Sequence, residues 1–376
     1  GLPTLAGSKI NRDLPPAARD AALIERLEAA GAVLVGALNM GEYAYDFTGE
    51  NIHDGPSHNP HDLARMTGGS SGGSGAAVAG GLVPISLGSD TNGSIRVPSS
   101  LCGLFGLKPT YGRLSRARGF PFVASLDHFG PFARTPRDLA LAYDAMQGPD
   151  PDDPACADRA AEPTLPHLER GLHGLRIAVA GGYFKCKNAE VVYAMDRVAA
   201  ALGANRDIEI PQAERARAAA FVITATEGSS LHLDRLRKRA EDYDPAVRDR
   251  LIAGALAPAA LVVKAQKFRR WYRTEVLKLF TQVDAILAPA TPCTAPLIGQ
   301  QMFKLGDIEM PVRANLGIYT QPISFIGLPV VAVPVPLAPL PIGVQVIAAP
   351  WREDVALRIA HALEAKGVVA AMRPAL

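Results

Sequence analysis

Two glycine- and serine-rich stretches constrain this chain more than any other feature. The first is Gly68-Gly69-Ser70-Ser71-Gly72-Gly73-Ser74-Gly75, and the second is Gly88-Ser89-Asp90-Thr91-Asn92-Gly93-Ser94. Glycine at this density lets the backbone approach a bound group closely, and the serines present hydroxyls to it. The second stretch follows an apolar segment, Leu82–Leu87, and so falls where open α/β sheets place their ligands. We therefore predict a catalytic site here.

The remaining chain alternates helical and strand-like patterns, which favours an α/β fold. Apolar spacing predicts helices over residues 16–31, 136–146, 191–202 and 351–367, and mainly helical structure over 212–280. Short apolar runs predict buried strands at residues 32–36, 82–87, 175–180, 284–289 and 330–334. The polar segment between residues 39 and 65 is expected to be an extended surface connection.

Composition excludes several classes of protein. The net charge of +2 and the absence of a block of like charge argue against nucleic acid or a membrane surface as partner. No apolar run reaches the roughly 20 residues that span a bilayer, and no signal peptide opens the chain, so we expect a cytoplasmic protein. The four cysteines are widely spaced, which is typical of reduced thiols, and neither a metal nor a cofactor is predicted.

The first glycine-serine stretch has three candidate interpretations. A phosphate-binding loop needs a lysine after the glycines, and none follows here. Gly68–Gly72 fits the GxSxG pattern of a nucleophile elbow, but the preceding Asn59–Thr67 is polar rather than strand-like, and no histidine has distinguishing flanks. In the third interpretation both stretches form one site, with Ser70 and Ser94 separated by 94 − 70 = 24 positions.

The two stretches together resemble the amidase signature family. The match runs through Gly68–Ser74, Gly93–Pro98 and Cys102–Thr110, and continues at residues 127–131, 288–292 and 321–329. The resemblance implies one amidase domain over residues 1–376, with a signature core of about 30–135 and a helical excursion of about 212–280. The fold it implies is a central mixed, twisted β-sheet covered on both faces by α-helices.

The resemblance also implies a mechanism. Ser94 would be the nucleophile that attacks an amide carbonyl, and Ser70 would relay the proton. The peptide bond between Gly69 and Ser70 would be cis. Ser71 would either support this relay or cap a helix. The oxyanion hole would consist of the backbone N–H groups of Thr91, Asn92, Gly93 and Ser94.

The family's general base is a lysine that desolvation keeps neutral. In the family it precedes a segment resembling Leu2–Ser8, so we expect it upstream of Gly1. Lys9 lies on the wrong side of that segment, and Lys108 is expected to be structural. Because the other catalytic positions are intact, we favour a base outside residues 1–376 over a non-catalytic scaffold subunit of the same fold.

Several further residues are assigned by their positions in the motifs. Asp90 and Arg96 flank the nucleophile and are expected to form a structural ion pair. Arg248 and Arg250 lie where glutamine-using relatives carry a carboxylate-binding arginine. The candidate substrate-binding residues are Gly69, Tyr45, Asp127, Arg248, Arg250, Tyr319 and Gln321.

Two groups within the family are candidates for the nearest relatives of this chain. Glutamyl-tRNA amidotransferase A subunits, which are glutaminases, carry an aspartate where this chain has Gly317. Residues 45–56 and 111–118 resemble instead the carboxybiuret hydrolases of cyanuric acid catabolism, which release ammonia from a small carboxylated substrate. This resemblance further implies a small helical partner similar to the amidotransferase C subunit, and a homodimer of such pairs.

Overall fold

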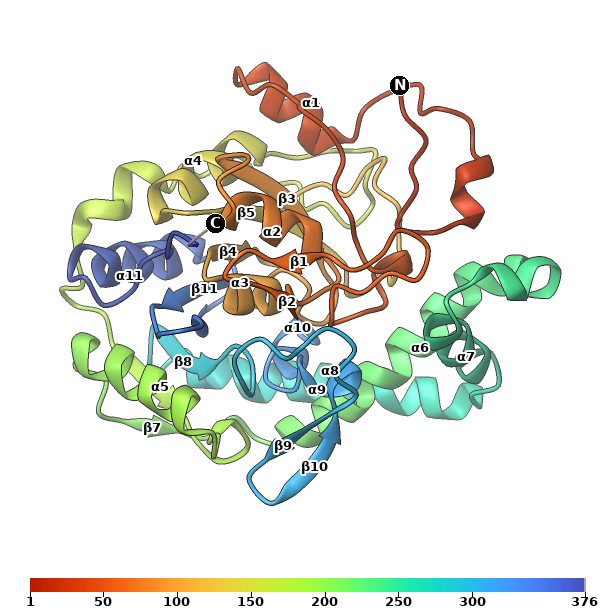
Figure 1. The fold of residues 1–376 in the computed structure, drawn as a ribbon. Coiled ribbons are helices and arrows are strands. Elements are labelled where there is room, and N and C mark those ends of the chain that lie inside the picture. The colour runs from red at the N-terminus through yellow and green to blue at the C-terminus, as the bar shows by residue number, and fades with distance from the viewer. Residues whose placement is uncertain (375–376) are drawn as a thin grey trace.

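A single eight-stranded sheet lies at the centre of the computed structural model, which describes residues 1–374 (Figure 1). The strand order is β3-β5-β4-β11-β12-β8-β6-β7. Neighbouring strands are antiparallel, except that β6 runs parallel to β7 and β8, so the predicted mixed sheet is confirmed. The strands are β3 (Ile85–Asp90), β4 (Phe105–Lys108), β5 (His128–Ala133), β6 (Ile177–Ala180), β7 (Asp207–Ile208), β8 (Ala285–Pro289), β11 (Val330–Val335) and β12 (Ile342–Ala348).

Helices cover both faces of the sheet, because successive side chains of each strand point to opposite faces. On one face, Ala285 and Leu287 of β8 pack with α4, α5 and α11. On the other face, Ile286 and Ala288 pack with α6 and α8. The helices are α1 (Ala22–Ala29), α2 (Gly72–Ala79), α3 (Arg96–Cys102), α4 (Pro136–Met146), α5 (Ala189–Leu202), α6 (Ala213–Arg239), α7 (Pro245–Ala255), α8 (Ala259–Leu279), α9 (Val312–Asn315), α10 (Gln321–Ser324) and α11 (Glu353–Ala365).

Shorter elements complete the fold. Two hairpins pair β1 with β2 and β9 with β10 outside the main sheet. They comprise β1 (His58–Asn59), β2 (Asp62–Met66), β9 (Met302–Leu305) and β10 (Ile308–Pro311). Short 3₁₀-helices occur at η1 (Ile10–Asp13), η2 (Glu42–Ala44), η3 (Leu165–Arg170), η4 (Gly182–Phe184) and η5 (Ala240–Asp242).

Polar caps fix where several helices begin. Thr135 accepts a hydrogen bond from the backbone of Asp138 at the start of α4, and Asn188 does the same for the first turn of α5. Asp244 caps α7 by accepting from the backbone N–H of Ala246. Such a cap is worth about 1 kcal/mol, because it satisfies an N–H that has no partner within the helix. Residues 213–279 are mainly helical, as predicted, and form α6, α7 and α8, of which α6 and α7 lie at the right of Figure 1.

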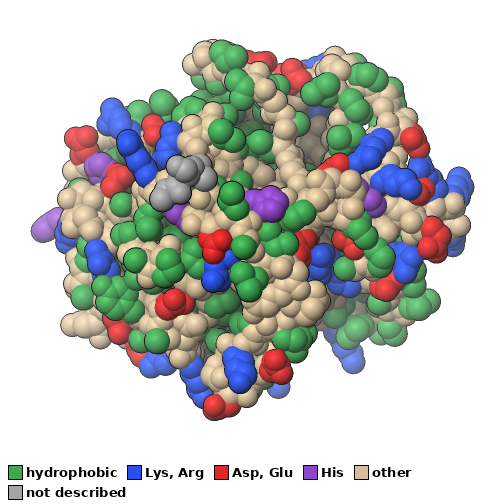
Figure 2. Space-filling view, viewed as in Figure 1, with side chains coloured by type: hydrophobic (Ala, Val, Ile, Leu, Met, Phe, Trp, Pro, Cys, Tyr) green, Lys and Arg blue, Asp and Glu red, His purple; other side chains and the backbone are tan. Residues whose placement is uncertain are grey.

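The predicted strand at residues 32–36 is wrong, and the helix expected over 16–31 is only the shorter α1. Val33 and Val35 are 82% and 75% exposed, and no strand of the described chain pairs with them. An apolar run forms a strand only where a neighbour supplies hydrogen bonds. In Figure 2, hydrophobic side chains gather along the upper margin of the molecule, over this N-terminal segment.

The expectation of a surface connection over residues 39–65 is also wrong for its first part. Tyr43, Asp46 and Asn51 are buried. This polar segment can be buried because its own backbone satisfies its side chains: Asp46 accepts hydrogen bonds from the N–H groups of Thr48 (2.8 Å) and Gly49 (2.6 Å). Residues 44–47 consequently form part of a cavity wall rather than the outer surface.

The charged side chains on the face drawn in Figure 2 are mixed in sign. Among the helices of residues 1–374, none is both long and apolar enough to cross a membrane.

Candidate active site

A buried ion pair holds the loop between β3 and α3. Arg96 donates to Asp90 through Nε and Nη2 (2.9 Å each), and to Thr320 O (3.1 Å) and Gln345 Oε1 (2.7 Å) through Nη1. Both side chains of the pair are fully buried. Burial alone would raise the pKa of Asp90, but the charge of Arg96 and its hydrogen bonds hold that pKa well below the ordinary range. Arg96 therefore positions the loop and does not reach a substrate.

The loop residues Thr91, Asn92, Gly93 and Ser94 present free backbone donors. Within the described chain, none of their four N–H groups donates a hydrogen bond. Gly93 has φ +143°, and a Cβ at this position would lie 2.1 Å from Thr320 Oγ1. Thr320 in turn donates to Asn92 O (2.7 Å). The loop is thus fixed in a shape that only glycine permits, with N–H groups available to an oxyanion.

The first glycine-serine stretch lies beside this loop. The Gly69–Ser70 peptide bond is cis. Gly69 N–H donates to Phe47 O (2.9 Å), and Ser70 O accepts from Gly41 N–H (3.0 Å), so the backbone on both sides of the bond is held. Ser70 Oγ is buried and has no hydrogen-bond partner in residues 1–374. A buried hydroxyl without a partner is uncommon and marks a place where another group is expected.

Ser71 joins the two stretches. It occupies the N-cap position of α2, but its side chain makes no capping hydrogen bond, so the capping alternative is wrong. Instead, Ser71 Oγ donates to Ser89 O (3.3 Å) and accepts from Ser89 N–H (3.2 Å). These bonds fix the turn that carries Ser70 against β3.

A cavity opens over Ser94. Its volume is about 210 Å³, somewhat below that of drug-sized ligand sites, so it suits a small substrate. The lining comprises loop residues, aromatic rings and two arginines: Ala44, Tyr45, Asp46, Phe47, Thr91, Asn92, Ser94, Phe122, Phe221, Ala246, Arg250, Pro311, Arg313, Ala314 and Gln321.

Of the two arginines predicted in α7, only Arg250 lines this cavity. Its Nε donates to Ala246 O (2.7 Å), Nη2 donates to Tyr45 O, and its guanidinium lies 3.8 Å from the centre of the Tyr45 ring. Arg248 pairs instead with Asp249 (2.9 Å) outside the cavity, so its assignment to substrate binding is wrong. Arg250 is held by its backbone contacts and its ring contact in a fixed orientation.

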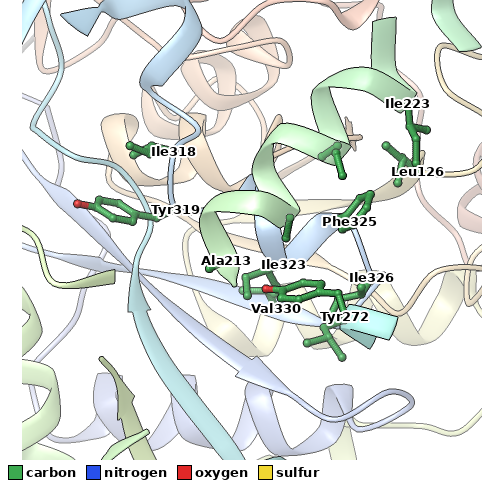
Figure 3. Close-up of a cluster of buried hydrophobic side chains, with 14 of the residues drawn as sticks. Leu126, Ala213, Ile223, Tyr272, Ile318, Tyr319, Ile323, Phe325, Ile326 and Val330 are labelled. Carbon is green, nitrogen blue, oxygen red and sulfur yellow. The ribbon is translucent and has the colours of Figure 1, made fainter. Parts of the chain in front are cut away.

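Two residues after Gly317 were predicted to bind substrate, and only one of them lines the cavity. Gln321 lines the cavity; its Oε1 accepts from Arg217 Nε (2.8 Å), while its buried Nε2 has no acceptor in the described chain. Tyr319 does not line the cavity. It belongs to the hydrophobic cluster shown in Figure 3, where its ring packs near Phe184. Gln321 therefore faces the cavity, whereas Tyr319, two positions earlier, faces the hydrophobic core.

Gly69 and Asp127 lie behind the cavity rather than in its wall. A Cβ at position 69 would lie 2.6 Å from Asp46 Oδ2, so the space there is already filled. Asp127 accepts hydrogen bonds from Thr91 Oγ1 (2.6 Å) and from the N–H groups of Phe122 (2.8 Å) and Val123 (2.9 Å). Burial raises the pKa of Asp127 to about 6. We conclude that Asp127 positions the oxyanion loop.

Replacing Asp127 with asparagine should lower kcat by about 10- to 100-fold, because an amide cannot accept all three hydrogen bonds and presents an N–H to donors. In the native protein the carboxylate form prevails only above the raised pKa, so kcat should rise with pH through about 6. The variant should lack this step. Measuring kcat between about pH 5 and about pH 8 checks both points, and the same acid limb in both proteins would contradict the assignment.

No lysine of the described chain lines the cavity. Lys108 Nζ donates to Pro109 O (3.0 Å) and Leu328 O; its burial, followed by the charge of Arg96, lowers its pKa to about 7. Lys9 pairs with Asp242 at 2.7 Å. Among residues 1–374 there is likewise no group of three or more His, Cys, Asp or Glu side chains that could hold a metal ion. The chemistry available is that of serine hydroxyls, backbone donors and arginines.

Sequence reasoning missed several residues of the cavity lining, including an arginine and an aromatic residue. Arg313 on α9 and Phe47 both line it. A Cβ at position 317 would lie 2.4 Å from Phe47 Cζ, so the ring fills the space that a side chain at that position would take. Phe47 lies in the resembling segment 45–56 but was given no role, and the available signal for Arg313 was only that it lies four positions before Gly317.

Comparison with known proteins agrees with this geometry. A family model described as amidase matches residues 1–357. The AtzE protein of the 1-carboxybiuret hydrolase of Pseudomonas sp. (strain ADP) is 56% identical over 372 residues, which cover 98% of this chain and 81% of that protein. The A component of the glutamyl-tRNA(Gln) amidotransferase of Azotobacter vinelandii (strain DJ) is 39% identical over 393 residues, covering 96% and 80%.

Solved structures give the same result. A structure described as a vestigial protein complex that reveals the origins of an s-triazine catabolic enzyme superimposes with a TM-score of 0.98 at 55% sequence identity. The superposition covers 99% of this chain and 82% of that one.

Proposed function

The chain belongs to the amidase family and is an amide C–N hydrolase, and on this premise we propose that it releases ammonia from a small carboxylated amide of the urea type, such as 1-carboxybiuret. The observation that supports this most is one cavity lined by Ser94, by the oxyanion loop and by two arginines. A serine and free N–H groups suit acyl transfer, and guanidinium groups suit a carboxylate. The higher identity to a carboxybiuret hydrolase than to an amidotransferase supports the same choice.

The proposed reaction has two stages. Ser94 Oγ attacks the amide carbonyl carbon, its proton passes through Ser70 to the general base, and the carbonyl oxygen becomes an anion bound by the loop N–H groups. Each such donor contributes about 2.7–4 kcal/mol to the transition state. The C–N bond then breaks, and the leaving nitrogen takes a proton and departs as ammonia. Water attacks the Ser94 carbamate ester, which releases the carbamic acid and restores the hydroxyl.

We place the general base on a lysine upstream of Gly1. Ser70 Oγ is buried without a partner, and the lysines of the described chain do not line the cavity. A neutral lysine beside Ser70 would give that hydroxyl an acceptor and would take the proton. The alternative is a scaffold protein that has the fold without the base. Replacing that lysine in the full-length protein with alanine decides between them, because a scaffold has no amidase activity to lose.

Glutamine fits this cavity poorly. The free α-amino group of glutamine needs a carboxylate, and a side chain at position 317 is excluded by the ring of Phe47. Among the described residues, Asp46 is the one carboxylate in the lining, and it already accepts three hydrogen bonds from Thr48 and Gly49. A glutaminase of the amidotransferase A type is therefore the second candidate, and it rests on sequence similarity alone.

We expect the full-length protein to prefer carboxylated ureas over glutamine by at least about 100-fold in kcat/KM, because an unpaired buried ammonium group costs several kcal/mol. Ammonia release should be measured across 1-carboxybiuret, biuret, allophanate, malonamate and glutamine. Activity on glutamine alone would show that the substrate assignment is wrong and that the glutaminase alternative is right.

We also propose that the protein works with a small helical partner similar to the amidotransferase C subunit, forming a homodimer of such pairs. The related s-triazine enzyme was solved as a protein complex, which supports a partner. Light scattering of the co-expressed proteins should give the mass of two pairs, whereas the mass of a lone chain would contradict the proposal.

A further inference from the structure

Arg313 is the charged residue of the cavity whose hydrogen-bonding capacity is least used. It lies on α9, and its side chain is 29% exposed. Its Nη1 is 3.1 Å from Asp46 Oδ1 and 3.8 Å from Asp244 Oδ2, and Nη2 is 3.8 Å from Glu50 Oε2. Within residues 1–374 no acceptor completes a hydrogen bond with its Nη1, which is buried.

The surrounding carboxylates are bound elsewhere. Asp46 accepts from the backbone of residues 48 and 49, Glu50 accepts from Gly299 N–H (2.6 Å), and Asp244 caps α7. They form ion pairs with Arg313 and restrain its guanidinium, but no hydrogen bond from Nη1 is completed within residues 1–374. A guanidinium has five N–H donors, so Arg313 can still bind an anion.

The backbone that carries Arg313 is itself fixed. Arg217 Nη2 donates to Ala314 O (2.9 Å) and to Asn315 Oδ1 (2.7 Å), and so ties α9 to α6. A binding group on a braced element loses less entropy when it engages a ligand.

Arg250 supplies a second guanidinium in the same cavity. Two of its nitrogens donate to Ala246 O and Tyr45 O, and its Nη1 has no acceptor among the described residues. Two arginines thus line the cavity beside a single carboxylate of residues 1–374, Asp46, whose oxygens are occupied. Paired guanidinium groups with free donors are suited to one carboxylate, which they bind through several charge-assisted hydrogen bonds.

We propose that Arg313 determines specificity: together with Arg250 it binds the substrate carboxylate, so that anionic amides are selected over neutral ones. The inference rests on the proposed function and adds to it the residue that recognises the negative charge of the substrate. Arg250 alone offers one free nitrogen, whereas the pair brings enough donors to satisfy both oxygens of a carboxylate.

The test compares Arg313→Ala and Arg313→Lys in the full-length protein on 1-carboxybiuret and on biuret, which lacks the carboxylate. For Arg313→Ala we expect kcat/KM on 1-carboxybiuret to fall by about 10- to 100-fold, mainly through KM, because charge-assisted hydrogen bonds are lost. Activity on biuret should stay within about twofold. Arg313→Lys should recover part of the loss, since it restores the charge but not the fork of donors. Arg248→Ala, an arginine outside the cavity, is the control and should behave as the native protein.

An equal loss on both substrates would show that Arg313 only supports the fold, and an unchanged preference would overturn the proposal. A native protein that hydrolyses neither compound would refute the proposed function instead. The role of Arg313 is then decided by calorimetric binding of malonamate and of malonamide to the Ser94→Ala protein. Weaker binding of malonamate alone, when Arg313→Ala is added, supports the inference; equal affinities with and without Arg313 contradict it.

Discussion

Replacing Ser94 with alanine is expected to lower ammonia release by at least about 10⁴-fold, because the acyl-enzyme cannot form without the hydroxyl. The fold should be unaffected. Within the described chain Ser94 Oγ makes no hydrogen bond, so its removal leaves no buried partner unsatisfied. The measurement is an ammonia assay on the full-length variant, with a thermal unfolding curve beside it.

A matched control is Ser99→Ala. Ser99 is a buried serine of α3 whose Oγ also lacks a partner in residues 1–374, and it is not in the cavity lining. This variant should keep native activity and stability. A Ser94→Ala protein that still releases ammonia at the native rate would exclude Ser94 as the nucleophile.

Replacing Arg96 with methionine is expected to destabilise the protein by about 3–5 kcal/mol, because Asp90 would be left as an unpaired charge in the core. Hydrogen bonds to Thr320 O and Gln345 would be lost at the same time. The free energy of unfolding from urea titration measures this effect. Since the pKa of Asp90 is held below its ordinary range, the pair's stabilisation should persist at neutral pH and be lost only as the pH falls into the strongly acid range.

The double variant Asp90→Asn with Arg96→Met serves as the comparison. It removes both charges, so it should be more stable than Arg96→Met alone. A loss of less than about 1 kcal/mol in the single variant would contradict the structural role of the pair, since surface pairs contribute that little.

The fold was predictable where local chemistry and pattern agreed. α4 and α5 follow from their apolar spacing, and their observed bounds are close to those predicted. β12 was not predicted, because Gly343 and the buried Gln345 interrupt its apolar pattern. Gln345 is in the core because it accepts from Arg96, a contact that no local pattern shows. At residues 32–36 the opposite error occurred: the apolar run predicted a strand, but no neighbouring strand of the described chain pairs with it.

The site was predictable only where residues belong to motifs. Ser70, Ser94 and the oxyanion loop occur in two nearby stretches, and Arg250 was assigned, together with Arg248, from the place of an arginine in glutamine-using relatives. Phe47 and Arg313 come from distant segments that only the fold brings to one cavity. Tyr319 was assigned by its motif position, but its side chain is buried in the hydrophobic core and does not line the cavity.

The most direct test of the account is covalent labelling of the full-length protein by a fluorophosphonate, followed by peptide mass spectrometry. We predict one adduct, on the peptide that contains Ser94, and slower labelling when 1-carboxybiuret is present in excess. No adduct, or an adduct on another serine that 1-carboxybiuret does not protect, would contradict the claim that this cavity is the amidase active site.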